Sequence, residues 1–405
     1  MRPATLIATG CGTAIATVCA FGLTQMQGHA PGVWSALAVV AAGALCLLLA
    51  RIFGRLSTVV PSGAGLLAFV SRGLGRRAGI VIAVPYLLLT LFLVGVEATI
   101  AGTLVHRLAP VMPTAAGALV FLVGTWAFCR AGARIGFKAQ LAATAALVTL
   151  LSGLAVWAIV RSHGLTLFAA PPSPLGFVAA TGQALFLFMG FELLTAHAEQ
   201  ARPRAVDVGL TGTVALLVPF YALVALGVAA LPAGDPFELL ARAEGPLLPL
   251  GVLVCLLASF TSFNGALLGL SRFTAALAAQ GALPRSLSKV APPRLVPTNA
   301  LNVLLVLAVA ATALVHWGHA LEPALLAAAV AAALLYAGAA WVREGAPFAE
   351  VGRSLVKRAA GRALAVSLVV LALGVLAGAG AGTLVLLGAA WAVAGLFSLR
   401  LWRPA

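Results

Sequence analysis

Long apolar runs, each about as long as one crossing of a lipid bilayer, dominate this chain. A transmembrane helix needs about 20 apolar residues to cross the hydrocarbon core, and such windows follow one another in close succession, separated by proline, glycine and charge. The mean hydropathy is +1.10 and only 9% of the residues are charged, whereas soluble domains average about 25%. These features exclude a water-soluble globular protein and predict an all-α integral membrane protein.

The apolar windows predict about 12 transmembrane helices in a chain of this length. We place these spans at residues 4–24, 33–53, 80–105, 112–129, 139–160, 176–198, 208–231, 246–271, 299–317, 320–342, 361–378 and 381–402. The connections between them are short, so almost the whole chain is expected to lie in or beside the bilayer.

Basic residues are distributed unequally between the two sets of loops. The chain has 25 lysines and arginines and a formal net charge of +15. If the N-terminus is cytoplasmic, only Arg107, Arg161 and Arg242 lie outside, which is the pattern of the positive-inside rule. We therefore expect a multi-pass protein of the cell inner (cytoplasmic) membrane with both termini in the cytoplasm. The basic excess then faces anionic lipid headgroups, and nucleic acid is not an expected partner.

Glycines interrupt two spans at matching places in the chain. Five spans carry the chain across the membrane, so a second set of five has the opposite orientation, as an inverted repeat requires. The first span contains Gly10, Gly12 and Thr13, and the sixth contains Gly182 and Gly190. Helices broken at such places expose backbone N–H and C=O groups to a ligand at mid-membrane. Alternatively, these glycines only allow neighbouring helices to pack closely.

Three stretches resemble the amino acid, polyamine and organocation transporter superfamily. F-G-R-L-S-T-V-V-P-S-G-A-G-L-L-A-F-V, from Phe53, is similar to the family's Y-A-E-L-x-x-x-F-P-x-x-G-G-x-Y-x-Y segment. F-L-F-M-G-F-E, from Phe186, is similar to F-x-G-F-E. S-R-F-T-A-A-L-A-A-Q-G-A-L-P, from Ser271, resembles S-R-x-x-x-x-M-A-R-D-G-x-L-P. Within the superfamily, the chain looks most like the bacterial exporters of methionine and branched-chain amino acids.

This resemblance implies a leucine-transporter-type fold of five plus five inverted helices with two helices appended. The first repeat would comprise residues 1–160, the second residues 176–342, and the accessory spans residues 361–402. The chain departs from the family where G-C-G-T-A-I-A-T, from Gly10, replaces the usual G-S-x-I-G-x-G-I-F. The span 139–160 also lacks the lysine that some proton-coupled relatives use in place of a sodium ion.

Two acids lie within predicted spans, although a charged group at the membrane centre costs about 2.5–3.5 kcal/mol on insertion scales. Glu192 matches the acid of the family's F-x-G-F-E motif. It could hold the broken helix, bind the substrate ammonium group or carry a proton. No motif supports Glu97, for which a hydrogen bond between helices and a coupling role are both open.

The candidate substrate-binding residues combine the two predicted breaks with their neighbours. The substrate carboxylate is expected at the first break and its ammonium group at the carbonyls of the second. The resemblance gives Phe186 the place of a gating aromatic residue, with core packing as the alternative. The substrate-binding set is Gly10, Gly12, Thr13, Phe186, Met189, Gly190 and Glu192, and the candidates for coupling or for lining the cavity are Glu97 and Asn264.

These observations predict a secondary active transporter that moves neutral aliphatic amino acids by alternating access, as a permease, exporter or antiporter, with proton coupling as one option. A polyamine or cationic amino acid antiporter of the same superfamily is the alternative. The sequence has no phosphate loop, G-x-S-x-G elbow or H-E-x-x-H motif, which disfavours a membrane enzyme, and a passive channel is likewise disfavoured. The five cysteines show no C-x-x-C spacing, and no metal or cofactor is expected.

Overall fold

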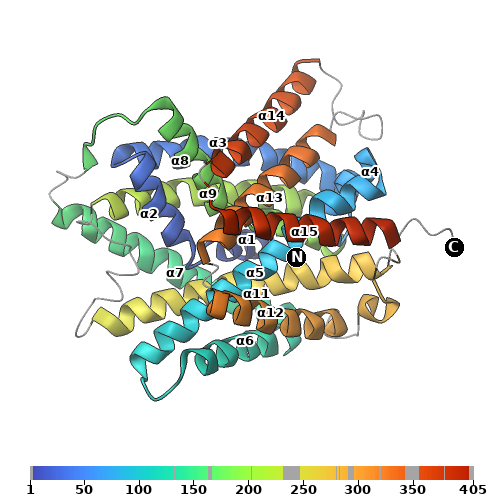
Figure 1. Ribbon diagram of the computed structural model, residues 1–405, viewed down its shortest axis with the longest axis horizontal. Helices are drawn as coiled ribbons and strands as arrows, with labels where there is room; N and C mark the ends of the chain where they lie inside the picture. Colours follow the sequence, from blue (N-terminus) through green and yellow to red (C-terminus); the bar gives the residue numbers. More distant parts are fainter. Residues whose placement is uncertain are drawn as a thin grey trace.

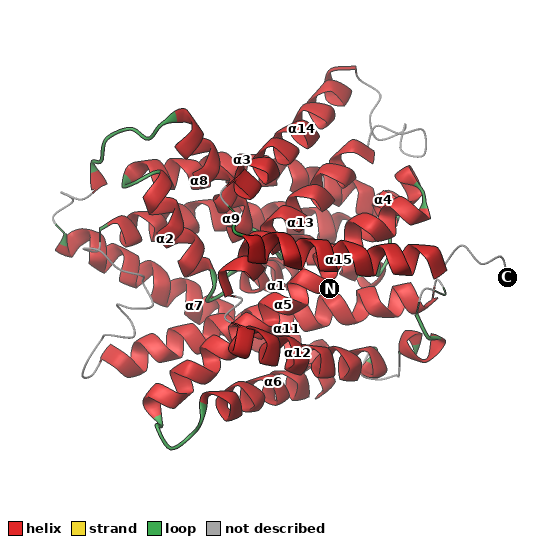
Figure 2. Cartoon of the chain, viewed as in Figure 1, coloured by secondary structure: helices red, strands yellow, loops and turns green. Residues whose placement is uncertain are grey.

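The computed structural model describes residues 3–131, 133–162, 167–201, 203–230, 247–279, 281, 283–290, 296–318, 321–342, 355–377 and 379–400. Across these residues the chain is helical and contains no β-strand (Figure 2). The all-α fold predicted from the apolar windows is therefore confirmed.

Ten helical segments of the described residues are long and apolar enough to cross a membrane. Nine of the predicted spans coincide with the single long helices α3 (Val33–Val59), α5 (Arg76–Leu108), α6 (Thr114–Ala131), α7 (Ala133–Arg161), α9 (Pro203–Ala229), α11 (Leu247–Ala279), α12 (Thr298–Gly318), α13 (Leu321–Val342) and α15 (Ala381–Arg400). The predicted span 361–378 corresponds to the apolar part of α14 (Leu355–Ala377).

The two remaining predicted spans are each divided into two short elements. The first consists of α1 (Pro3–Ala14) and α2 (Cys19–His29), and the sixth of α8 (Pro174–Leu187) and η2 (Phe191–Gln200). Helix α8 begins with a Ser–Pro pair, in which the Ser173 hydroxyl accepts a hydrogen bond from the Gly176 amide and Pro174 occupies the first helical turn. Element η2 is a 3-10 helix, which rarely continues beyond four residues.

Two further short helices lie between the long ones. Helix α4 (Leu66–Leu74) follows α3 and is flanked by Gly65 and Gly75, which have φ values of +51° and +89°. Only glycine adopts such backbone angles readily, so the two glycines allow the chain to turn at both ends of α4. The one-turn element η3 (Arg285–Ser288) follows α11 and packs against it.

Helix α1 lies in the middle of the bundle, surrounded by the longer helices (Figure 1). It packs against α7, α9, α11 and η2. The most extensive helix pair is α3 with α9, and glycines allow its close approach. A Cβ atom at Gly43 or Gly54 of α3 would overlap Val218 or Asp207 of α9. Close packing through small residues is the usual way in which membrane helices associate.

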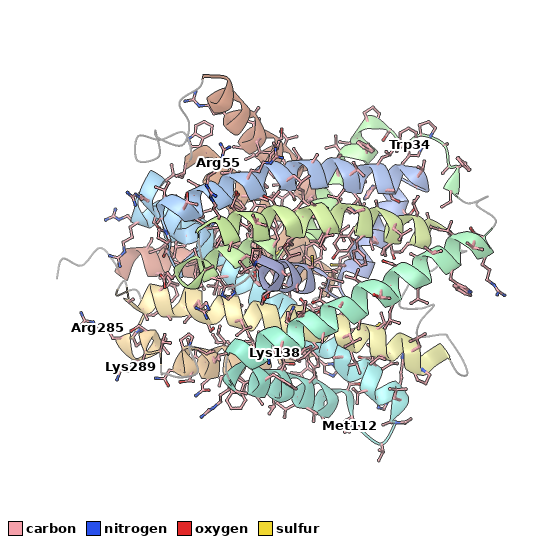
Figure 3. All side chains as sticks on the ribbon, turned by 180° about the vertical axis from the view of Figure 1, so that it is seen from behind. Trp34, Arg55, Met112, Lys138, Arg285 and Lys289 are labelled. Atoms are coloured by element: carbon pink, nitrogen blue, oxygen red, sulfur yellow. The ribbon has the colours of Figure 1, made fainter. Side chains whose placement is uncertain are left out.

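The outer surface is apolar, and several basic side chains lie at its ends. Val120 of α6, Val306 of α12 and Val385 of α15 are 63%, 67% and 68% exposed, as expected for lipid-facing positions. Arg55, Arg285 and Lys289 lie at one end of the molecule, and Trp34 lies at the other (Figure 3). Arg242, one of the three basic residues predicted outside, falls beyond the described residues.

Candidate functional site

The two helix breaks meet in the centre of the molecule. Residues 15–18 form break 1, between α1 and α2, and residues 188–190 form break 2, between α8 and η2. Gly190 has a φ of +109°, which favours glycine. A Cβ atom here would lie 3.0 Å from the Thr13 Cγ2 atom and 3.2 Å from the Thr13 main-chain oxygen. The end of α1 is therefore in direct contact with break 2.

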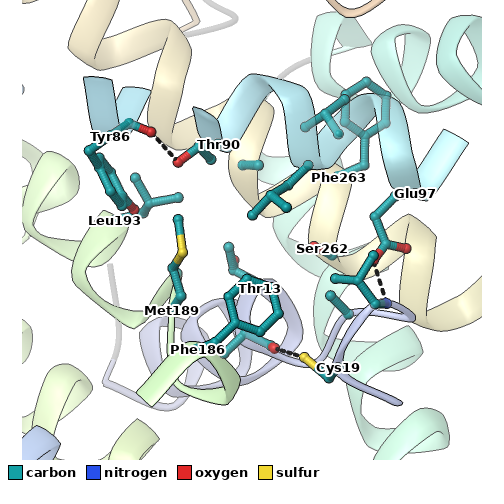
Figure 4. Close-up of a pocket in the computed structure, with 17 residues that line it drawn as sticks. Thr13, Cys19, Tyr86, Thr90, Glu97, Phe186, Met189, Leu193, Ser262 and Phe263 are labelled. Carbon is teal, nitrogen blue, oxygen red and sulfur yellow. Dashed lines mark hydrogen bonds between the residues drawn. The ribbon is translucent and has the colours of Figure 1, made fainter. Parts of the chain in front are cut away.

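A cavity lies where the breaks meet, and α5 and α11 complete its wall (Figure 4). We call it the central cavity; it contains about 490 Å³ of empty space, part of it open to solvent. Its lining comprises Thr13, Ala14, Ala16, Val18, Cys19, Tyr86, Thr90, Leu93, Val94, Glu97, Phe186, Met189, Gly190, Leu193, Ser262, Phe263 and Ala266. Most of these side chains are apolar. Among these lining residues Glu97 is the only acid, and there is no lysine, arginine or histidine.

Glu192 is buried beside the central cavity, where several donors meet its carboxylate. Tyr86 of α5 and Tyr336 of α13 both donate hydrogen bonds to it, the second at 2.5 Å. The Gly190 amide lies 3.1 and 2.9 Å from its two oxygens. A carboxylate of 1% exposure is thus held by two phenols and a main-chain N–H group, and it ties break 2 to two other helices.

Glu97 makes the corresponding connection to break 1. Its carboxylate accepts a hydrogen bond from the Val18 amide at 2.9 Å (Figure 4). It accepts another from the Ser259 hydroxyl of α11 at 2.7 Å. Val18 is the N-cap residue of α2, so the carboxylate lies beside the N-terminal end of that helix. A negative group is favourable there because the helix dipole presents its positive end.

The carbonyl side of break 1 also has a fixed partner. The Ala14 carbonyl, at the end of α1, accepts a hydrogen bond from the Tyr221 hydroxyl of α9 at 2.8 Å. The chain has only three tyrosines, and all three are buried and bound to one of the breaks or to the acid that holds it. The rare phenol groups of this apolar chain are therefore concentrated on its two irregular segments.

The structure brings together part of the set of residues predicted for the site. Thr13, Phe186, Met189, Gly190 and Glu97 line the central cavity. Gly10, Gly12, Glu192 and Asn264 are not among its lining residues.

Gly10 and Gly12 lie inside helix α1, because break 1 begins three residues beyond Gly12. A Cβ atom at Gly10 would lie 2.8 Å from the Leu194 side chain of η2, and one at Gly12 would overlap the Gln140 side chain of α7. Both glycines thus allow close packing around α1, and their role in substrate binding stays a prediction.

Asn264 belongs to a buried polar chain that runs between helices. Its side-chain amide donates to the Gln140 Oε1 atom at 2.6 Å, and Gln140 donates to the Thr261 carbonyl at 2.9 Å. Its own oxygen lies 3.2 Å from the Cys129 Sγ atom. These contacts connect α6, α7 and α11 without a charged group.

The C-terminal end of the broken sixth span contacts the loop between α3 and α4. The Gly63 amide donates a hydrogen bond of 2.6 Å to the Glu199 carboxylate of η2. A Cβ atom at Gly65 would lie 3.4 Å from the Ala196 amide nitrogen. The P-S-G-A-G segment that carries part of the family resemblance therefore packs directly on η2.

Tyr86, Tyr336 and Ser259 were not among the predicted site residues. A sequence signal existed for Tyr86, which lies eleven residues before Glu97 on α5. Eleven residues make about three helical turns, so both side chains share one face of the helix. The signal for Tyr336 was weaker, because only its rarity in an apolar chain sets it apart.

Comparisons with known proteins agree with this geometry. A family model described as amino acid permease matches residues 4–342. No curated protein matches the chain.

Two solved structures share the fold. One is Mhp1, a nucleobase-cation-symport-1 family transporter, in a closed conformation with bromovinylhydantoin bound. Its TM-score is 0.64 at 15% identity, over 99% of this chain and 93% of that one. The other is a mutant form of a manganese transporter of Eremococcus coleocola, with a TM-score of 0.61 at 16% identity over 99% and 92% of the two chains. The fold is thus that of leucine-transporter-type transporters. Because the family model covers most of the sequence, the chain belongs to the amino acid permease family.

Proposed function

We propose that this permease is a secondary active transporter that moves neutral aliphatic amino acids across the cytoplasmic membrane by alternating access. The observation that carries the proposal is the central cavity, which lies between two broken helices and is lined mostly by apolar side chains. Broken helices supply main-chain polar groups for the two charged ends of an amino acid. The apolar lining suits an aliphatic side chain.

In the proposed complex the substrate lies between the end of α1 and break 2. The carboxylate points toward break 1 and Thr13, where α2 presents its N-terminus. The ammonium group points toward the carbonyls around Gly190, with the negative charge of Glu192 nearby. The side chain then packs among Phe186, Met189 and the other apolar lining residues.

The cytoplasmic barrier follows from the same arrangement, with both termini placed in the cytoplasm. Tyr86 lies ten residues from the start of α5, the end that carries Arg76 and Arg77. In this orientation the Tyr86–Glu192–Tyr336 cluster lies on the cytoplasmic side of the cavity, and the contact of Glu199 with Gly63 lies still further in. We propose that both separate when the cavity opens inward, and that residues 1–160 and 176–342 are the two moving repeats.

A polyamine or cationic amino acid antiporter is the second candidate, because Glu97 places one carboxylate on the cavity wall. That carboxylate already accepts hydrogen bonds from Val18 and Ser259. A cationic side chain would have to compete with these donors or remain unpaired at high cost. The neutral substrate is therefore the better match.

Counterflow in proteoliposomes tests the proposal. Vesicles loaded with unlabelled leucine are diluted into labelled leucine, and isoleucine, valine, methionine, arginine and putrescine are added as competitors. We expect the neutral aliphatic amino acids to compete and the two cationic compounds not to compete. Stronger competition by arginine than by leucine would favour the antiporter of cationic substrates instead. Each of the six compounds is then used in turn as the loaded and labelled substrate, and absence of exchange for all six would refute both candidates.

A further inference from the structure

Glu97 is a buried acid whose partners are all neutral. Its side chain is 2% exposed, the Val18 amide and the Ser259 hydroxyl donate hydrogen bonds to it, and the Thr17 main chain and hydroxyl also interact with it. Within the described parts of the chain, no lysine, arginine or histidine pairs with it. A lone ionised carboxylate in a membrane interior is costly. A proton is the simplest group that can remove this charge.

The hydroxyl groups beside Glu97 form a chain that suits either protonation state. The Ser259 Oγ atom lies 2.7 Å from the Glu97 Oε2 atom and 2.7 Å from the Thr17 Oγ1 atom. Thr17 in turn lies 3.0 Å from the Cys255 carbonyl oxygen, to which it donates. Hydroxyl groups both donate and accept, and their hydrogens rotate freely.

Two arrangements of the hydrogens therefore give every oxygen in this row of hydroxyl groups a hydrogen-bond partner. With Glu97 ionised, Ser259 donates to the carboxylate. With Glu97 protonated, the acid donates to Ser259, Ser259 donates to Thr17, and Thr17 donates to the Cys255 carbonyl. The change needs one proton added to the carboxylate and a rotation of hydroxyl hydrogens. No heavy atom has to move.

The hydrogen-bond partners of Glu192 do not suit both of its protonation states. The Gly190 amide lies within 3.1 Å of both of its oxygens, and a main-chain N–H group cannot become an acceptor. Two phenols donate to the same carboxylate. At Glu97 the Val18 amide donates to Oε1, and Oε2 faces the reversible hydroxyl group of Ser259.

Other titratable groups around Glu97 do not supply a competing charge. Those on elements that approach this part of α5 are Cys19, Tyr221, Cys255, Cys129 and His316. The thiols and the phenol are neutral at physiological pH in their ordinary state. His316 is exposed at the end of α12.

The state of Glu97 is transmitted to break 1 through Thr17 and Val18. When ionised, the carboxylate attracts the positive N-terminal end of α2; protonation removes that attraction. We propose that Glu97 binds and releases one proton in each transport cycle and that its charge controls how firmly break 1 is held against α5. This inference rests on the proposed transport function.

Paired flux measurements on the full-length protein in proteoliposomes test the proposal. Net leucine flux is measured with and without a pH gradient, and leucine–leucine exchange is measured at equal pH. In Glu97→Gln, the amide keeps an acceptor for Val18 and a donor for Ser259, as the protonated acid does. We expect this variant to retain exchange while its net flux becomes the same with and without the gradient.

Two matched variants make the comparison specific. Glu192→Gln should lower net flux and exchange by similar factors and keep the response to the gradient. Glu322→Gln, at an exposed acid outside the network, should behave as the unmodified protein does. A gradient response retained in Glu97→Gln or lost in Glu192→Gln would overturn the proposal. The proposal would also be overturned if the unmodified protein exchanges leucine but its net flux does not respond to the pH gradient.

Infrared difference spectra between acidic and alkaline pH test the proton site without any substrate. We expect a carboxylic acid C=O band in the unmodified protein that is missing in Glu97→Gln and present in Glu192→Gln. Ser259→Ala, which keeps the acid but removes its acceptor, should shift that band to higher frequency. A band unaffected by both Glu97→Gln and Ser259→Ala refutes the site. If the unmodified protein moves no amino acid but shows the expected band, the transport proposal is refuted and the proton site at Glu97 is not.

Discussion

Gly190 shows how one residue determines where a membrane helix breaks. Its φ of +109° is open to glycine, and its missing side chain leaves room for Thr13. The motif F-M-G-F-E predicted a break at this place, and the structure has it there. Gly10 and Gly12 gave a similar signal in the first span, yet they are packing residues within α1. Local sequence cannot separate these two uses of glycine, because the difference lies in which neighbour approaches.

Replacing Gly190 by valine should abolish transport. A β-branched residue at this backbone angle costs about 1–3 kcal/mol, and its side chain would also overlap Thr13. We expect normal insertion into the membrane and no leucine counterflow.

Gly124→Val is the matched control, because Gly124 lies in α6 with no atom within 4 Å of its added Cβ. This variant should transport normally. Transport by Gly190→Val at the unmodified rate would show that the unusual backbone angle is not needed.

The sequence could not predict which residues form hydrogen bonds with the two buried acids. Glu97 and Glu192 stood out as acids in apolar spans. Ser259 and Tyr336 lie far from them along the chain and become partners only after helices α11 and α13 have packed. The candidate acids were thus visible in the sequence, whereas the hydrogen bonds that give them their different properties arise from tertiary structure.

Helix α5 is the element that connects the two breaks. Tyr86 reaches break 2 through Glu192, and Glu97 reaches break 1 directly. Thr90, Leu93 and Val94 lie between them and line the central cavity. One helix face thus contacts both irregular segments and lines the proposed substrate site. We therefore expect a displacement of one break to move α5 and, through it, the other break.

The position of α5 depends on its contact with α12 at Gly95. A Cβ atom there would lie 2.8 Å from the Ala311 carbonyl carbon and the Thr312 nitrogen. An alanine gains up to about 1 kcal/mol in helix propensity, but overpacking against a backbone costs about 1–3 kcal/mol. We therefore expect Gly95→Ala to lower the thermal unfolding temperature in detergent.

Gly153→Ala provides the comparison on α7, where no atom lies within 4 Å of the added Cβ. Only the propensity gain applies to that variant, so its unfolding temperature should stay the same or rise. An equal response of the two variants would show that the contact between α5 and α12 does not limit stability.

The whole molecule combines an apolar exterior with an irregular centre. The positions of the membrane helices followed from length and hydropathy, which act along the chain and need no knowledge of contacts; ten segments of the described residues meet both criteria, against about twelve predicted spans. Helix ends were less well predicted. Helices α5 and α11 each have 33 residues, more than one crossing needs, because helices can continue beyond the hydrocarbon or tilt within it.

The orientation of the molecule can be measured by labelling with a membrane-impermeant thiol reagent. The described cysteines are all buried, so background labelling should be low. Val111 is 93% exposed in the loop between α5 and α6, and Ser286 is exposed in η3. In intact cells we expect Val111→Cys to react and Ser286→Cys to react only after the membrane is permeabilised. The reverse pattern would invert the proposed topology.

The 3-10 winding of η2 has a mechanical consequence for the molecule. A 3-10 helix rises about 2.0 Å per residue and an α-helix about 1.5 Å. The ten residues of η2 would therefore shorten by about 5 Å on rewinding as an α-helix. If Gly190 keeps its contact with Thr13 during this change, the whole of the shortening would appear at the opposite end of η2. It would draw Glu199 away from the Gly63 amide, so a change of winding within one short element would be enough to separate the two segments that meet there.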